Sequence, residues 1–240
     1  MKKITIILVL LFFNIIAWAQ KTITFSSLDS LTITADLYLN DEKLPYIILC
    51  HQAGFSRGEY KETATKFNKF GYNCIAIDAR SGDAVNGVKN ETAALAKKQN
   101  KATSYLDAEQ DIIAAINYAF KLSNKKVILV GSSYSASLVL KIATTNDKVK
   151  AVLAFSPGEY FGDKLNLKET IKSLSKPLFV TSSKEEAPAV TELIKDIKII
   201  EKQQFIPTKN GKHGSKALWK ENDNNQEYWM SLMLFMLNIK

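Results

Sequence analysis

The sequence has few of the side chains that bind metals or form disulfides. Its 240 residues contain two histidines and two cysteines, and they form no Cys/His cluster. We therefore predict no metal site, and we expect no cofactor. Cys50 ends one predicted strand and Cys74 begins the next, an offset of roughly 13 Å at a rise of about 3.3 Å per residue. A disulfide spans at most roughly 7 Å between Cα atoms, so we predict that both thiols stay unpaired.

The sequence also lacks an internal repeat, a linker and a concentrated basic segment. The net charge is +8, but the lysines are spread along the chain and are not interleaved with aromatic residues. This distribution argues against a nucleic-acid partner and favours an ordinary solvated surface. Residues 20–240 are enough for one domain with a full core. The sequence leaves the oligomeric state open.

The N-terminus has the pattern of a secretory signal peptide. Two lysines precede the apolar run 4–16, and Ala17-Trp18-Ala19 then matches a cleavage site of the A-x-A kind. An uncleaved anchor is the alternative, but the run is short for a membrane span and contains Asn14. We predict that residues 1–19 are removed and that the protein is exported, to the periplasm or the medium. After cleavage we expect no stable membrane association.

Strands and helices alternate along the rest of the chain. Two short strands, 22–25 and 31–39, are expected to open the fold as an antiparallel pair. Further strands are predicted at 45–50, 73–78, 126–131, 149–155, 177–182 and 203–206, and helices at 57–70, 104–121, 134–145, 167–175, 189–196 and 224–238. Such alternation is typical of an α/β fold in which helices cover both faces of a mostly parallel sheet. The polar segment 83–103 suggests only a short helix at 92–98, and its role is open.

The most informative segment is Gly131-Ser132-Ser133-Tyr134-Ser135, between an apolar strand and an apolar helix. A serine in a tight strand–turn–helix, with small residues on either side, matches a nucleophile elbow. The turn forces Ser133 into a strained conformation and points its hydroxyl out above the sheet. Its neighbours Ser132 and Ser135 are rival nucleophiles, and position favours Ser133. The backbone N–H of Tyr134, at the helix N-terminus, can donate to a developing oxyanion.

A serine nucleophile needs a base, and the base needs an acid that orients it. In this architecture the expected chain order is serine, acid, histidine. His51 precedes the serine, so His213 is the base available. The acid should follow the strand at 177–182, where the loop offers Glu185 and Glu186 and no aspartate. We favour Glu186, and Glu185 remains the alternative.

Together these features resemble the α/β-hydrolase superfamily, nearest to its dienelactone-hydrolase-like and small serine esterase branches, over residues 22–240. His51-Gln52-Ala53-Gly54 is similar to the His-Gly-x-x oxyanion motif of that family, with Gln52 in place of glycine. The turn Asp78-Ala79-Arg80-Ser81-Gly82 and the His213 loop add to the likeness. The resemblance implies the fold, without a large cap domain, and a serine-hydrolase activity. It also implies a second oxyanion donor, the backbone N–H of Ala53 or, less favoured, of Gln52, with His51 as a structural residue of the turn.

Residues 156–166 lie at the edge of the sheet where relatives insert a lid. About a dozen residues are too few for a cap domain, so we expect an open site that prefers short acyl groups. Tyr160 and Phe161 either line the acyl pocket or simply pack. Ser56-Arg57-Gly58-Glu59, earlier in the chain, is predicted to be a capping box at the start of the helix 57–70.

The sequence thus predicts a secreted carboxylesterase that acts on small-molecule esters through an acyl-enzyme. Two alternatives share the fold: a binding protein that has lost the chemistry, and an amidase or peptidase. A lyase or dehalogenase is a third, but such relatives usually carry aspartate in place of the elbow serine.

Overall fold

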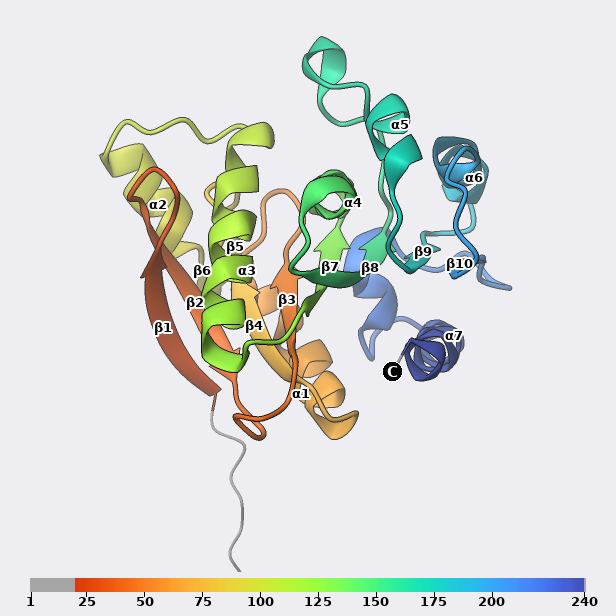
Figure 1. Cartoon of the computed structure of the whole chain (residues 1–240), viewed down its shortest axis with the longest axis horizontal. Helices are drawn as coiled ribbons and strands as arrows, with labels where there is room; N and C mark the ends of the chain where they lie inside the picture. Colours follow the sequence, from red (N-terminus) through yellow and green to blue (C-terminus); the bar gives the residue numbers. More distant parts are fainter. Residues whose placement is uncertain (1–19, 240) are drawn as a thin grey trace, which may run out of the picture.

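A computed structural model describes residues 20–239, which form one eight-stranded sheet and a small separate hairpin (Figure 1). The strand order is β1-β2-β4-β3-β7-β8-β9-β10. The strands of the main sheet are β1 Gln20–Ser26, β2 Thr32–Tyr38, β3 Tyr46–Cys50, β4 Asn73–Ile77, β7 Val127–Ser132, β8 Val149–Phe155, β9 Leu178–Thr181 and β10 Lys202–Phe205. In the main sheet β2 pairs antiparallel with β1 and β4, and the remaining pairs are parallel. This is the predicted α/β-hydrolase fold.

Helices cover both faces of the sheet, as expected. They are α1 Lys61–Lys69, α2 Glu91–Lys98, α3 Glu109–Ser123, α4 Tyr134–Thr145, α5 Leu167–Thr170, α6 Ala187–Ile194 and α7 Asn225–Asn238. α2 to α6 pack on one face, and α1 and α7 pack on the other. Among residues 20–239, no large cap interrupts this arrangement.

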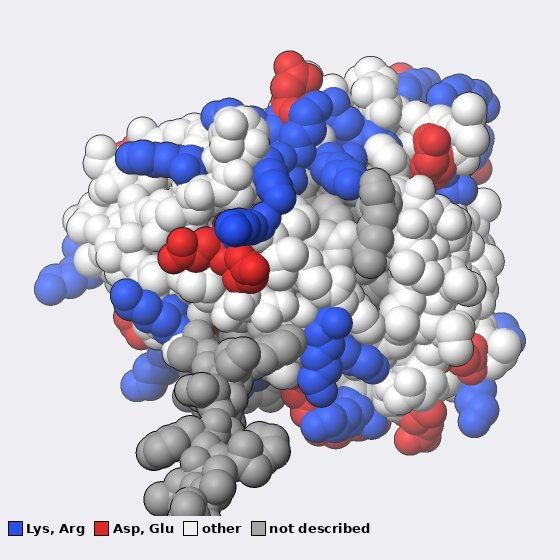
Figure 2. Space-filling view, turned by 60° about the horizontal axis from the view of Figure 1, so that its bottom comes forward, with Lys and Arg blue, Asp and Glu red and all other residues white. Residues whose placement is uncertain are grey.

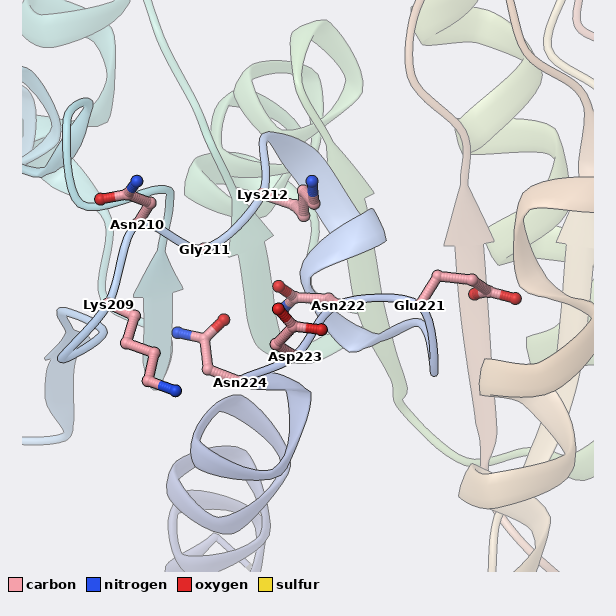
Figure 3. A pocket seen from close by; sticks show the side chains of 8 residues that line it. All are labelled: Lys209, Asn210, Gly211, Lys212, Glu221, Asn222, Asp223 and Asn224. Atoms are coloured by element: carbon pink, nitrogen blue, oxygen red, sulfur yellow. The ribbon is translucent and has the colours of Figure 1, made fainter.

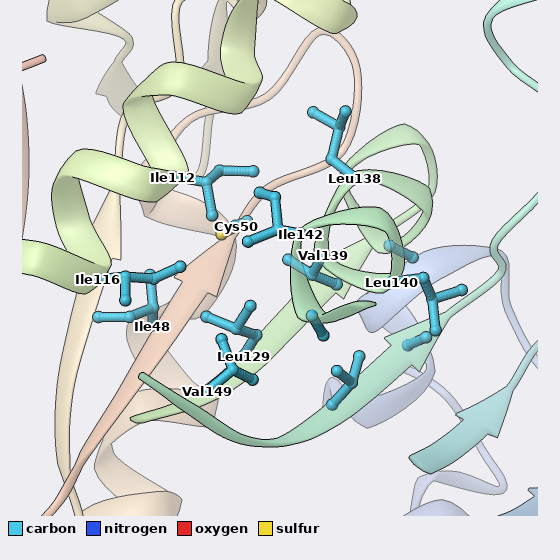
Figure 4. Packing of buried hydrophobic residues seen from close by; sticks show 14 of the residues in the cluster. Ile48, Cys50, Ile112, Ile116, Leu129, Leu138, Val139, Leu140, Ile142 and Val149 are labelled. Atoms are coloured by element: carbon cyan, nitrogen blue, oxygen red, sulfur yellow. The ribbon is translucent and has the colours of Figure 1, made fainter. Parts of the chain in front are cut away.

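Two apolar cores result because successive residues of a strand point to opposite faces. In β3, Ile48 and Cys50 enter the core under α3 and α4, whereas Ile47 and Leu49 enter the core under α1 and α7. Figure 4 shows the first core, where Ile48 and its neighbours meet the side chains of α3 and α4. Central strands buried on both faces require the continuous apolar runs that the sequence contains.

Three segments differ in detail from the expectation. The predicted helix 57–70 begins as a 3₁₀ turn, Arg57–Tyr60, before α1. The predicted helix 167–175 is split into the short α5 and a 3₁₀ turn at Ile171–Ser173. The segment 83–103 contains the hairpin of β5 Ala84–Val85 and β6 Val88–Lys89, followed by α2, which confirms the short helix.

The cysteine prediction is confirmed. In the pairing of β3 with β4, Cys74 lies opposite Ile47. Ile47 is three residues before Cys50, so the two cysteines are offset along the strands. Within the described residues both cysteines are buried and unpaired. Burial raises the pKa of each thiol, because the low-polarity interior disfavours the thiolate.

The predicted signal peptide, residues 1–19, lies outside the described residues. Between residues 20 and 239, no helix combines the length and apolarity needed to cross a bilayer. On the face seen in Figure 2, Lys and Arg side chains gather in the upper part and again in the lower part, and Asp and Glu side chains lie beside both groups. This face therefore carries charge of both signs.

Candidate active site

The elbow has the strained geometry that the sequence predicts. β7 ends at Ser132 and α4 begins at Tyr134, and Ser133 between them has φ 59° and ψ −123°. A backbone in such a sparsely populated region costs a non-glycine residue roughly 1–3 kcal/mol, and such strain concentrates at functional sites. The turn is tight because a Cβ atom on Gly131 would lie 2.5 Å from the Cα atom of Ala136. Glycine is therefore required at that position.

The rival serines are occupied within the interior. The Ser135 hydroxyl lies 2.6 Å from the carbonyl oxygen of His51 and 2.8 Å from that of Cys50. The Ser132 hydroxyl accepts a hydrogen bond of 2.9 Å from the backbone N–H of Ser215. Both side chains belong to fully buried residues, whereas Ser133 is 7% exposed. Of the three serines, only Ser133 reaches solvent.

Glu186 and His213 come together at the same edge of the sheet. Nδ1 of His213 hydrogen-bonds to Oε1 of Glu186, while Glu185 is exposed. Oε2 of Glu186 accepts from the hydroxyl of Ser156 at 2.7 Å and from the N–H of Ser183 at 3.1 Å. Burial raises the pKa of Glu186, but the hydrogen bonds from His213 and Ser156 outweigh it and lower the pKa to about 2. The carboxylate of Glu186 is therefore ionised at neutral pH, and it holds the imidazole of His213 by its Nδ1 atom.

The histidine loop is held against the elbow. The N–H of Ser215, two residues after His213, donates to Ser132, which directly precedes Ser133. Ser133 and His213 are both described by the structure, but no hydrogen bond joins the hydroxyl of Ser133 to the imidazole of His213. In free enzymes such contacts are often long and tighten only when substrate binds. Because Nδ1 is occupied by Glu186, Nε2 is the nitrogen available for proton transfer.

The candidate oxyanion donors are backbone N–H groups in the turn after β3 and at the start of α4. The N–H of Gln52 donates to Oε2 of Glu59 at 2.8 Å, so it is occupied. This leaves Ala53, the favoured candidate in that turn. Tyr134 is the first residue of α4, so its N–H has no partner within the helix. The N–H groups of Ala53 and Tyr134 therefore remain the candidates for oxyanion donors.

His51 is a structural residue, as predicted. It is fully buried, and its Nε2 accepts from the backbone N–H of Ala79 at 3.0 Å. Its Nδ1 lies 2.8 Å from the carbonyl oxygen of Gln52. These contacts tie the turn after β3 to the turn after β4.

Glu59 is a part of the site that the sequence did not reveal. Ser56 caps the 3₁₀ turn by accepting from the N–H of Gly58 at 3.2 Å, but Glu59 does not complete the predicted capping box. Its carboxyl group instead accepts from Gln52 and from the hydroxyl of Ser215. Burial raises the pKa of this carboxyl group. Glu59 therefore connects the oxyanion turn with the histidine loop.

The two predicted pocket residues have different environments. Tyr160 is partly exposed and lies beside Ser133, and its hydroxyl donates to the carbonyl oxygen of Ser156 at 3.0 Å. Burial raises the pKa of this phenol. Phe161 is buried in the core on the side of α2 to α6, which agrees with the second of its two predicted roles, packing. Tyr105, which the sequence did not suggest, stacks on the ring of Tyr134 with centroids 4.4 Å apart.

A polar cavity of about 510 Å³ lies beside the histidine loop (Figure 3). It is lined by Lys209, Asn210, Gly211, Lys212, Glu221, Asn222, Asp223 and Asn224. Its charges are mixed, and its lining does not include the elbow, the acid or the histidine. Within the described part of the chain, no group of three or more His, Cys, Asp or Glu side chains could hold a metal ion.

Comparison with known proteins assigns the sequence to a family. The model of the dienelactone hydrolase family matches residues 33–211. No curated protein sequence matches the chain. The matched region includes the elbow and the acid loop, and it ends just before His213.

Solved structures agree on the fold. The Pyrococcus furiosus esterase Pf2001 superposes with a TM-score of 0.68 at 17% identity, over 92% of this chain and 91% of the other. Dienelactone hydrolase from Anabaena variabilis superposes with a TM-score of 0.67 at 11% identity, over 91% of this chain and 95% of the other. The acylaminoacyl peptidase of Pyrococcus horikoshii superposes with a TM-score of 0.66 at 18% identity, over 91% of this chain but only 41% of the peptidase. With three quarters of its length covered by the family model, this chain belongs to the dienelactone hydrolase family and is a hydrolase with the α/β-hydrolase fold.

Proposed function

We propose that the protein is an exported serine esterase in which Ser133 is the nucleophile, His213 the base and Glu186 the acid. The observation that carries this proposal is the hydrogen bond between Glu186 and His213, on a loop fastened to the residue before a strained serine. A carboxylate that fixes Nδ1 leaves Nε2 to take a proton. This arrangement also disfavours a protein that only binds.

The reaction follows from these positions. Oγ of Ser133 attacks the ester carbonyl carbon while Nε2 of His213 takes the hydroxyl proton. The N–H groups of Ala53 and Tyr134 donate to the oxyanion of the tetrahedral intermediate. The intermediate collapses, and the alcohol leaves with the proton from His213. A water molecule then attacks the acyl-enzyme with the same base and releases the carboxylic acid and Ser133.

We infer that the substrates are small esters with short acyl groups. The loop 156–166 is too short to close over a long chain, and Phe161 is in the core. An acyl chain that projects into solvent forgoes up to about 0.8 kcal/mol for each methylene left unburied. An amidase or peptidase would use the same groups, and a matched pair of aryl ester and aryl amide separates the two activities.

A panel of chromogenic esters from acetyl to octanoyl tests this proposal. We expect kcat/KM to be highest from acetyl to butyryl, without activation at a lipid interface. Ser133→Ala should abolish turnover, whereas Ser137→Ala, in the same helix, should retain it. A profile that rises steadily to long chains would contradict the short-acyl inference, and full activity of Ser133→Ala would contradict the nucleophile. Export is tested by sequencing the mature N-terminus, which should begin at Gln20.

A further inference from the structure

Ser156 lies where the loop after β8 meets the loop of Glu186 and the loop of His213. It follows β8 directly, and its backbone N–H donates to the carbonyl oxygen of Thr181, the last residue of β9, at 2.7 Å. The residue is 1% exposed. Its φ of 54° is in the left-handed region, which glycine adopts at less cost. A buried serine in such a conformation suggests that its side chain is needed there.

The hydroxyl of Ser156 makes two hydrogen bonds of opposite direction. It accepts from the N–H of Gly214 at 2.9 Å, which is the residue after His213. Since a backbone N–H can only donate, the hydroxyl proton is free to point at Glu186, whose Oε2 lies 2.7 Å away. One atom therefore joins the acid to the loop that bears the base. The carbonyl oxygen of the same residue accepts from Tyr160.

We propose that Ser156 is a positioning residue that fixes the positions of Glu186 and His213 relative to each other. This inference rests on the proposed function for its effect on catalysis. His213 binds Oε1 of the carboxylate, and Ser156, together with the N–H of Ser183, binds Oε2, so both oxygens are held in place. Of these partners of the carboxylate, only Ser156 also contacts the residue after His213. The contact with Gly214 also fixes the backbone next to His213, and with it the position of the imidazole relative to the sheet. Ser156 does not touch the reacting atoms, so it acts through the acid and the base.

The kinetic test uses two variants that remove the hydroxyl. Ser156→Ala and Ser156→Gly should each lower kcat on a short ester by about 10- to 100-fold, because small misplacements of catalytic groups have effects of this size. KM should change less than about threefold, because the substrate is not contacted. Ser137→Ala is the matched control. Among residues 20–239 its hydroxyl binds the backbone of Gly158, in the same loop as Ser156, and contacts neither Glu186 nor His213. The kcat of this variant should stay within about twofold of wild type. Wild-type kcat in Ser156→Gly would show that the backbone turn alone matters and would overturn the proposal.

A spectroscopic test does not depend on turnover. The chain has two histidines, so ¹⁵N-histidine labelling gives two rings, and His213→Ala assigns them. We expect a far-downfield proton on Nδ1 of His213 in the wild type, which shifts or disappears in both Ser156 variants and persists in Ser137→Ala. An unchanged signal in Ser156→Ala would overturn the positioning role. If the wild type hydrolyses no ester but the signal responds as expected, the proposed function fails and the positioning inference stands.

Discussion

The two sides of the candidate active site are fastened by different interactions. On the oxyanion side, the ends of β3 and β4 are held by buried charges. Arg57 pairs with Asp36 at 3.1 Å and with Asp78 at 2.5 Å, and Arg80 pairs with Asp111 at 2.7 Å. These side chains are almost fully buried. Turns fixed in this way have little freedom to move.

On the side of the acid and the base, the loops after β8, β9 and β10 are held mainly by hydroxyl groups. Ser156 bridges the loops that carry Glu186 and His213, and the hydroxyl of Ser132, at the end of β7, accepts from the N–H of Ser215. The hydroxyl of Tyr228 donates to the carbonyl oxygen of Ser182 at 3.0 Å. The side chains of His213 and Glu186 are 37% and 32% exposed. This side can therefore be altered without breaking a buried ion pair.

The difference teaches where activity and stability separate. A buried ion pair that loses one partner leaves an uncompensated charge and destabilises the fold strongly. A single hydrogen bond from a serine or tyrosine hydroxyl group contributes less to folding than a buried ion pair does, but it sets the geometry on which catalysis depends. We therefore expect changes on the acid–base side to affect rate, and changes on the oxyanion side to affect folding first.

The largest expected effect is on the acid–base side. His213→Ala should lower kcat on the order of 10⁶-fold, and Glu186→Gln on the order of 10⁴-fold, because the nucleophile and base act as a unit and the acid orients them. Glu185→Gln is the matched control and should be close to wild type. Steady-state kinetics measure this ranking. If the two glutamate variants rank the other way, Glu185 is the acid.

The second effect is on the oxyanion side. Arg80→Ala should lower the free energy of unfolding by about 3–5 kcal/mol, because Asp111 is left charged and unpaired in the core. Urea denaturation measures the loss. The matched control is Glu192→Ala, which breaks exposed pairs with Lys168 and Lys195 and should leave stability nearly unchanged. Equal losses in the two variants would contradict the contrast between the two sides.

The smallest effect is at Glu59, which connects the two sides. Glu59→Gln loses one hydrogen bond to Gln52 or Ser215, and we expect about 1–3 kcal/mol of destabilisation at acid pH. Burial raises the pKa of Glu59 above its ordinary value of 4.5, so its favourable contribution is fully present below that pH. The contribution is lost as the pH rises through the folded-state pKa. Urea titrations at several pH values should show the wild-type advantage shrinking as pH increases, and an advantage that grows would contradict this.

Much of the site could be predicted from the sequence because it follows local rules. The elbow is a contiguous strand–turn–helix pattern, and the order of acid and histidine is set by the topology of the sheet. The fold was predictable because each buried strand is a continuous apolar run.

The supporting residues could not be predicted because their partners are distant in the chain. Ser156 meets Gly214, and Glu59 meets Ser215, only when separate loops converge at one edge of the sheet. No periodicity marks such a contact. Glu59 also matched a capping box, so the local rule suggested a partner that the tertiary structure replaced. Phe161 was ambiguous for the same reason, since an aromatic residue in a loop can pack inward or line a pocket.

The central claim is that Ser133 is the nucleophile. Labelling with a fluorophosphonate followed by peptide mass spectrometry tests it most directly, because the probe bonds only to an activated serine. We predict a single adduct on Ser133, lost in Ser133→Ala and strongly slowed in His213→Ala. An adduct on Ser132 or Ser135, or labelling that persists in Ser133→Ala, would contradict it.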